Sequence, residues 1–167
     1  GIEGACAHQH DVVLMDAYSL LDMRPGQISY LNDLNKLCPT KFYNVHFERG
    51  TKLIFGDRAH YFISGTASID RAGRVVHPGN VERQLDRALA NVDGLLASGG
   101  ACLEDMTHLI VYLRDAADYE RIRSALFERL PQIPAVFVKG PVCRPEWLVE
   151  VEGIAVTAHD APELPFF

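Results

Sequence analysis

The chain has 167 residues, with 16 Lys or Arg against 22 Asp or Glu, so its formal net charge is −6. Hydrophobic residues make up 48% of the chain, which is typical of a folded globular protein and not of a disordered one. The acidic balance argues against nucleic acid as a standing partner, because such a partner needs a basic surface. No apolar run approaches the roughly 18 residues of a membrane span, so no membrane partner is expected.

The cysteines and the start of the chain indicate a cytoplasmic protein. No two of the four cysteines form a CxxC pair, so we expect reduced thiols at Cys6, Cys38, Cys102 and Cys143. The first residues carry neither the charged region nor the apolar region of a signal peptide. The chain also lacks an initiator Met, which suggests a piece of something longer.

No cofactor or metal is expected from the motifs. The chain contains neither a GxxxxGK[ST] phosphate-binding loop nor a GxGxxG sequence. His8 and His10 are two residues apart, but spacing places no third ligand beside them, so we predict no metal site.

The sequence divides into three predicted parts. Residues 1–44 are broken by Pro25-Gly26, Asn32-Asp33 and Cys38-Pro39, so this leader is expected to form extended segments and turns without a core of its own. Residues 45–159 carry regular patterns and form the predicted domain. Residues 160–167 are expected to be a loose tail.

The domain begins with three predicted strands and a long helix. The strands are expected at residues 45–49, 52–55 and 60–64, separated by Gly50 and by a turn at 56–58. Apolar residues at three- and four-residue steps from Val81 to Leu96 then predict a helix. Asn80 is its expected N-cap, and Gly99-Gly100 its expected end.

The remaining elements complete an α+β pattern. We expect a strand at 107–113, a helix at 117–130 capped near Asp115 or Asp118, and strands at 135–139 and 148–157. One mixed sheet with two helices on one face is the economical arrangement. The other face then lacks a helix to cover Val149, Val151 and Ile154, so an oligomer or the leader must cover it.

The last loop and strand carry the most informative polar residues. Cys143 and Arg144 lie in a loop shaped by two prolines and a glycine, and the strand that follows alternates apolar and acidic residues. Glu150 and Glu152 therefore share one face. They indicate either a solvated polar face or a general acid or base beside a thiol and a guanidinium.

Several segments together resemble the RidA/YjgF family, also called endoribonuclease L-PSP. The matching segments are Phe62–Ile69, the helix positions Gln84, Leu89, Asn91 and Val92, the strand Leu109–Leu113, the pair Asp118-Tyr119, and Val149–Ala155. The resemblance covers about residues 45–158. It implies a chorismate-mutase-like α+β fold and a homotrimer with small-molecule pockets between subunits.

One departure from the family bears on its deaminase activity. Imine deaminases of the family carry Arg after Pro-Ala on the penultimate strand, where it holds the substrate carboxylate. This chain has Val136 there, after Pro134-Ala135. The deaminase glutamate corresponds to Glu150.

The chain also resembles the C-terminal half of the chorismatases, which implies either a fragment whose N-terminal domain is missing here or a standalone relative without that domain. The similar segments are Phe47–Gly50, the intact SGTASI at Ser64–Ile69, and His77–Gln84. Cys143 and Glu150 are seven residues apart, as are the active-site Cys and Glu of those enzymes. In them, a Cys at this position accompanies 3-hydroxybenzoate formation.

The resemblance implies a role for each candidate residue. Glu150 is the expected catalytic acid and Cys143 the residue that selects the product. Arg49 and Arg144 are expected to bind the carboxylates of a small metabolite, because Arg suits carboxylate geometry. Gly65, Thr66 and Ala67, in the segment that resembles the family's SG-containing strand, complete the expected substrate site. The primary prediction is chorismatase-like cleavage of a carboxylated enol ether with release of pyruvate.

Two other functions stay open. The first is a RidA-type enamine/imine deaminase in which Arg49 or Arg144 replaces the missing Arg. The second is a trimer that binds a small ligand without chemistry.

Overall fold

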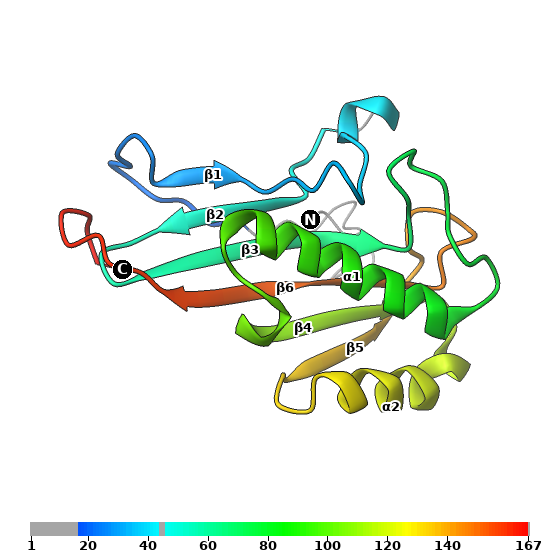
Figure 1. Ribbon diagram of the computed structural model, residues 1–167. Coiled ribbons are helices and arrows are strands. Elements are labelled where there is room, and N and C mark those ends of the chain that lie inside the picture. Colours follow the sequence, from blue (N-terminus) through cyan, green and yellow to red (C-terminus); the bar gives the residue numbers. More distant parts are fainter. Residues whose placement is uncertain (1–16, 44–45, 167) are drawn as a thin grey trace, which may run out of the picture.

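The computed structural model describes residues 17–43 and 46–166 and centres on one six-stranded sheet (Figure 1). The strand order is β1-β2-β3-β6-β4-β5. Only β4 and β5 run parallel among the paired strands, and the other neighbours are antiparallel. The strands are β1 (Ile28–Tyr30), β2 (Gly50–Ile54), β3 (Arg58–Ala67), β4 (Met106–Leu113), β5 (Ala135–Lys139) and β6 (Val149–Ala158).

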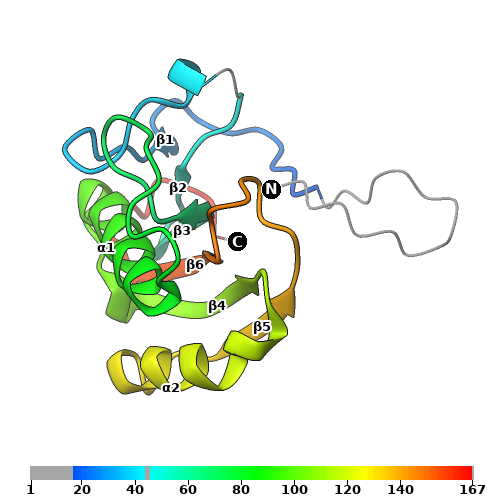
Figure 2. The ribbon, with the colours of Figure 1, turned by 90° about the vertical axis from the view of Figure 1, so that its right-hand side faces the viewer.

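Two α-helices cover one face of this sheet, as expected. They are α1 (Val81–Gly99) and α2 (Tyr119–Arg129), and Figure 2 shows both on the same side of the strands. Short 3-10 turns are η1 (Thr40–Tyr43), η2 (Leu103–Asp105) and η3 (Ala116–Asp118). The mixed sheet with helices on one face confirms the α+β fold class.

The ends of α1 follow the residues that the sequence indicates. The Asn80 side chain accepts a hydrogen bond from the Arg83 backbone N–H at 3.0 Å, which satisfies one of the free donors of the first turn. At the other end Gly100 has φ 89°, a left-handed conformation that glycine adopts without strain. At η3, just before α2, Asp115 is the cap that forms: its side chain accepts from the Ala117 N–H.

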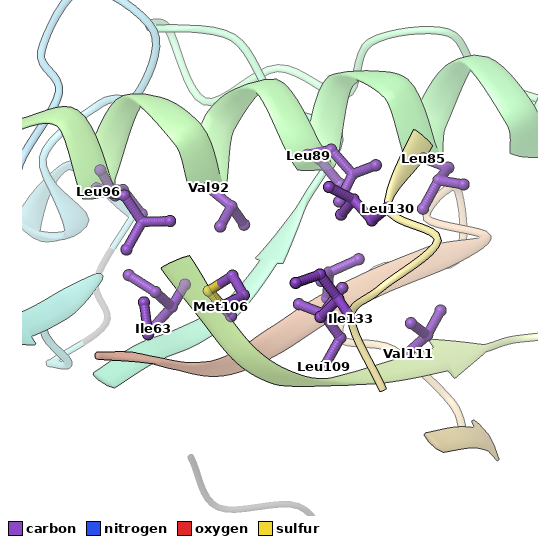
Figure 3. Close-up of a cluster of buried hydrophobic side chains, with 14 of the residues drawn as sticks. Ile63, Leu85, Leu89, Val92, Leu96, Met106, Leu109, Val111, Leu130 and Ile133 are labelled. Carbon is purple, nitrogen blue, oxygen red and sulfur yellow. The ribbon is translucent and has the colours of Figure 1, made fainter. Parts of the chain in front are cut away.

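The core lies between α1 and the sheet (Figure 3). Leu85, Leu89, Val92 and Leu96 point from α1 toward strand residues such as Ile63. Two predictions about the uncovered face were wrong. Val149 and Val151 are fully buried in this core, because alternation along β6 turns them toward the helices.

The face away from the helices, here called the open face, carries the alternate residues. From β3 and β6 these include Phe62, Ser64, Glu152 and Ile154, which line a shared surface groove. The expectation that Ile154 lies on the uncovered face is therefore correct.

The predicted strand at 45–49 did not form over residues 46–49, the part that the structure describes. The β2–β3 ladder begins at Gly50, which pairs with Ile63. Past Gly50, Ser64 makes two bonds to this segment: its N–H donates to the Arg49 carbonyl at 3.0 Å, and its hydroxyl donates to the Glu48 carbonyl at 2.7 Å. The strand predicted at 60–64 extends in both directions to 58–67.

Part of the predicted leader belongs to the sheet and the core. Residues 28–30 form the edge strand β1 beside β2, while Leu31 and Leu37 are buried in the core. The segment from Tyr18 to Met23 lies on the open face over β2 and β3, where the rings of Tyr18 and Phe62 are 5.7 Å apart. The leader therefore covers part of the open face.

The tail is packed over residues 160–166, so the expectation of a loose tail was wrong there. The Ala161 N–H donates to the Gly56 carbonyl at 3.0 Å, and the Gly56 N–H donates to the Pro165 carbonyl at 3.2 Å. The Arg24 side chain donates to the Glu163 carbonyl, which joins leader and tail.

The described residues form neither a membrane-spanning helix nor a cluster of metal ligands. No helix in residues 17–43 or 46–166 has the length and apolar character needed to cross a bilayer. Within the same residues no three His, Cys, Asp or Glu side chains are grouped as metal ligands. His8 and His10 lie outside the described residues.

Candidate functional site

The candidate residues gather at one end of the sheet, although they are spread over about 100 positions of the chain. This end holds the starts of β2 and β6 and the ends of β3, β4 and β5 (Figure 1). Arg49 directly precedes β2, Thr66 and Ala67 close β3, and Glu150 is the second residue of β6. Cys143 lies in the loop that enters β6.

A β-bulge shapes the floor of this region. Ile63 pairs with Gly153 and Thr66 pairs with Val151, so β3 carries one more residue than β6 between these two pairs. The extra residue brings the Cα of Gly65 against the Glu150 carboxyl group. A Cβ built on Gly65 would overlap Oε1 of Glu150 and lie 3.0 Å from its Cδ. Bulges of this kind commonly redirect side chains beside functional sites.

The two residues after Gly65 have different surroundings. Thr66 is 1% exposed, and its hydroxyl donates to the Ser64 carbonyl at 2.8 Å. Ala67 stands directly opposite Glu150, and its carbonyl accepts from the buried amide of Asn91 at 3.1 Å. Of these three predicted substrate-binding residues, Gly65 and Ala67 adjoin Glu150, while the Thr66 side chain is enclosed by the protein.

Glu150 is a buried carboxylic acid, with 6% of its surface exposed. Tyr112 of β4 stands opposite it and donates its phenol hydroxyl to Oε1 of Glu152 at 2.8 Å. Glu150 and Glu152 share the open face, as predicted. Burial of an acid next to a second carboxylate is an arrangement that favours proton transfer chemistry.

Both predicted arginines are engaged with the protein. Arg49 is 5% exposed and donates from Nε and Nη2 to the Cys38 carbonyl, each at 3.2 Å. Burial lowers the pKa of its guanidinium. Arg144 donates to the Gly73 carbonyl at 2.9 Å and lies 5.0 Å from the Trp147 ring centroid.

The thiol of Cys143 is exposed, in a loop that packs on the neighbouring elements. Gln84 of α1 is fully buried and joins this loop to the helix. Its amide donates to the Glu146 and His77 carbonyls at 2.9 and 3.2 Å, and its oxygen accepts from the Leu148 N–H at 2.8 Å. The loop thus has a defined path across the end of the sheet.

Val136 occupies an exposed position on β5, with 61% of its surface accessible. It pairs with Ile110 of β4, whose own neighbour on β6 is Glu152. An apolar side chain therefore stands at the position corresponding to the deaminase Arg.

A groove of about 240 Å³ crosses the open face beside the bulge. Its polar lining comes from Ser64, His108 and Glu152, and its apolar lining from Phe62, Ile110 and Ile154. Sequence reasoning did not single out Tyr112 or Arg114, whose contacts with Glu152 and with the Cys143 loop depend on long-range pairing. Tyr112 lies in the family-like segment Leu109–Leu113, but nothing in that segment indicates its bond to Glu152.

The family model for endoribonuclease L-PSP matches residues 55–157, which include the bulge, α1 and β6. This chain belongs to that family. RidA/YjgF is the same family, and its member RutC of Acinetobacter baylyi, a 3-aminoacrylate deaminase, is 31% identical over 96 residues. The match spans 56% of this chain and 76% of RutC.

Solved structures of the family share the architecture. RidA from an Antarctic Psychrobacter species aligns over 77% of this chain and 99% of its own, with a TM-score of 0.64 and 16% identity, and so shows the fold. A chorismatase aligns over 78% of this chain with a TM-score of 0.69 and 28% identity. The aligned region spans 44% of the chorismatase chain, less than half of its length.

Proposed function

We propose that this RidA/YjgF protein is a small-molecule enzyme in which Glu150 transfers a proton, and that it cleaves a carboxylated enol ether as chorismatases do. The observation that carries the proposal is the buried Glu150 carboxyl group, laid against the bulge at Gly65 at the sheet end that also holds the Cys143 loop. The 28% identity to a chorismatase supports this choice of chemistry.

In the proposed reaction, protonated Glu150 delivers its proton to the terminal methylene carbon of the enolpyruvyl group. The resulting cation makes the ether bond labile, and its cleavage releases pyruvate. Hydrolysis with one water leaves a cyclohexadiene diol. Loss of pyruvate without net water leaves 3-hydroxybenzoate, because these two products together have the composition of chorismate. Cys143 is proposed to favour the second outcome.

The substrate carboxylates need cations. We propose Arg49 and Arg144 for this role, with Gly65, Thr66 and Ala67 supplying the backbone around the substrate. Both guanidinium groups already donate to backbone carbonyls, which fixes their positions. In the proposed complex, their remaining N–H groups would donate to the substrate carboxylates. Cys38 and Cys102 carry free thiols, and we propose a cytoplasmic location, where thiols stay reduced.

A second candidate is hydrolysis of an enamine or imine, supported by the similarity to RutC. Here Glu150 would act on the water that adds to the C=N carbon, and ammonia would leave. The exposed Val136 side chain counts against this candidate, because it offers no charge to a substrate carboxylate.

We also propose that three copies assemble through the open face. Val136 and Val138 are exposed on β5, an edge strand of the sheet. Exposure of such an apolar sheet surface to water is unfavourable in free energy. Light scattering should give three times the monomer mass, and Val136→Lys should lower it. A monomeric wild-type protein would contradict the assembly.

Pyruvate release from chorismate tests the primary function. The wild-type chain should release pyruvate, while Glu150→Gln should lower kcat by about 10²-fold or more with little change in thermal stability. Glu128→Gln, an exposed glutamate on α2, is the matched control and should keep wild-type activity. No pyruvate, together with accelerated hydrolysis of 3-aminoacrylate or 2-iminopropionate, would replace this function by the second candidate.

A further inference from the structure

The loop between β5 and β6 is wrapped around one guanidinium group. Arg114, the residue directly after β4, donates from Nε to the Trp147 carbonyl at 2.7 Å. From Nη2 it donates to the carbonyls of Val142 and Arg144 at 2.7 and 2.6 Å. Three carbonyls of one loop therefore converge on a single side chain.

The three acceptors lie on both sides of Cys143. Val142 precedes the thiol residue and Arg144 follows it, so the backbone of Cys143 is held at its two neighbours. The outer side of the loop has another anchor, because Arg144 donates to the Gly73 carbonyl. The position of Cys143 therefore depends directly on the Arg114 guanidinium.

We propose that Arg114 is a positioning residue that fixes the Cys143 thiol relative to Glu150. Its planar group directs several donors along fixed directions, whereas the single ammonium group of a lysine cannot reach the same three carbonyls in that geometry. The effect on the products of catalysis rests on the proposed function. The effect on the loop does not.

The chain contains a reporter for this loop. Trp147 is its single tryptophan, is half-buried, and carries the carbonyl that accepts from Nε of Arg114. Any change in the path of the loop should alter the access of acrylamide to the indole ring, and hence the quenching of its fluorescence.

The test compares Arg114→Lys with Arg87→Lys in the full chain. Arg87 is a matched control, because it also donates to two backbone carbonyls, those of Ile69 and Lys36, away from the Cys143 loop. Arg114→Lys should raise the quenching constant of Trp147 about twofold and change the rate at which N-ethylmaleimide labels Cys143. Arg87→Lys should leave both unchanged, even where it lowers the melting temperature.

Turnover of chorismate supplies a readout that a purely structural role would not move. Arg114→Lys should lower kcat about tenfold with KM near that of the wild type, and shift the products from 3-hydroxybenzoate toward the diol. Unchanged Trp147 quenching and Cys143 labelling in Arg114→Lys would overturn the proposal. So would a changed loop with an unchanged product ratio. If the wild type releases no pyruvate, the proposed function fails, and quenching and labelling still decide the role of Arg114.

Discussion

The carboxyl group of Glu150 lies directly against the Cα of Gly65 on the adjacent strand, where a side chain on residue 65 would have to displace it. This contact joins a backbone irregularity in β3 to the chemistry proposed for β6. Replacing Gly65 by a larger residue is therefore expected to destabilise the protein through a specific overlap with Glu150.

Gly65→Ala should lower the free energy of unfolding by about 1–3 kcal/mol, because the added methyl group overlaps Oε1 of Glu150. The loss should largely disappear when Glu150→Ala is already present, since the overlapping carboxyl group is then gone. Urea unfolding of the single and double variants measures both values. Gly140→Ala, whose new Cβ would meet Tyr112 at an ordinary 3.7 Å, is the control. Additive losses in the double variant would contradict the steric explanation.

Gln84→Met should destabilise the protein by about 2–4 kcal/mol and loosen the Cys143 loop. The change removes three hydrogen bonds of a fully buried amide and leaves the Glu146 and His77 carbonyls and the Leu148 N–H without this partner. Chemical denaturation gives the stability, and hydrogen exchange of the loop amides gives the local effect. A loss below about 0.5 kcal/mol would show that water replaces the amide.

His77→Gly should give a protein about 1 kcal/mol more stable than His77→Ala. His77 has φ 59°, in the left-handed region where a Cβ is strained and glycine is not. Because neither variant contains the imidazole ring, the difference in their stabilities reports the backbone strain. Thermal unfolding of the two variants is the measurement, and equal stability would mean that the backbone relaxes at this position.

The stability of the protein should fall as the pH decreases below about 6.5, in part through His60. Burial lowers the pKa of His60 in the folded state, with the Arg58 charge acting in the same direction. The unfolded chain therefore binds a proton on this residue more readily, which favours unfolding at acidic pH. Unfolding free energies at pH 7.5 and 5.5 should differ less in His60→Gln than in the wild type. His159→Gln is the comparison variant, and an equal reduction there would remove the assignment to His60.

The sequence predicted those elements whose signals are local. The cap at Asn80, the apolar face of α1 and the stop at Gly100 all depend on neighbouring residues, and all three formed. The strand expected at 45–49 depends on a partner, and the regular β2–β3 ladder ends at the Gly50–Ile63 pair, where the β3–β6 register also shifts. The edge strand β1 has only three exposed residues, so no alternation marked it in advance.

The candidate site was predictable in its location but not in its contacts. Glu150 and the Cys143 loop were singled out from residue types and from the family resemblance, and the fold places them at one end of the sheet. That Arg49 and Arg144 bond to the carbonyls of Cys38 and Gly73 follows from tertiary packing, over separations of 11 and 71 residues. No sequence pattern encodes such pairs.

The bulge in β3 changes which alternate residues of the strand face away from the helices. Before it, Phe62 and Ser64 face away from the helices, and after it Ala67 takes that face opposite Glu150 while Thr66 turns inward. Strict alternation without the bulge would exchange the last two, placing the Ala67 methyl group in the interior and the Thr66 hydroxyl beside the acid. The one extra residue of β3 therefore decides which of Thr66 and Ala67 lies beside the carboxyl group of Glu150.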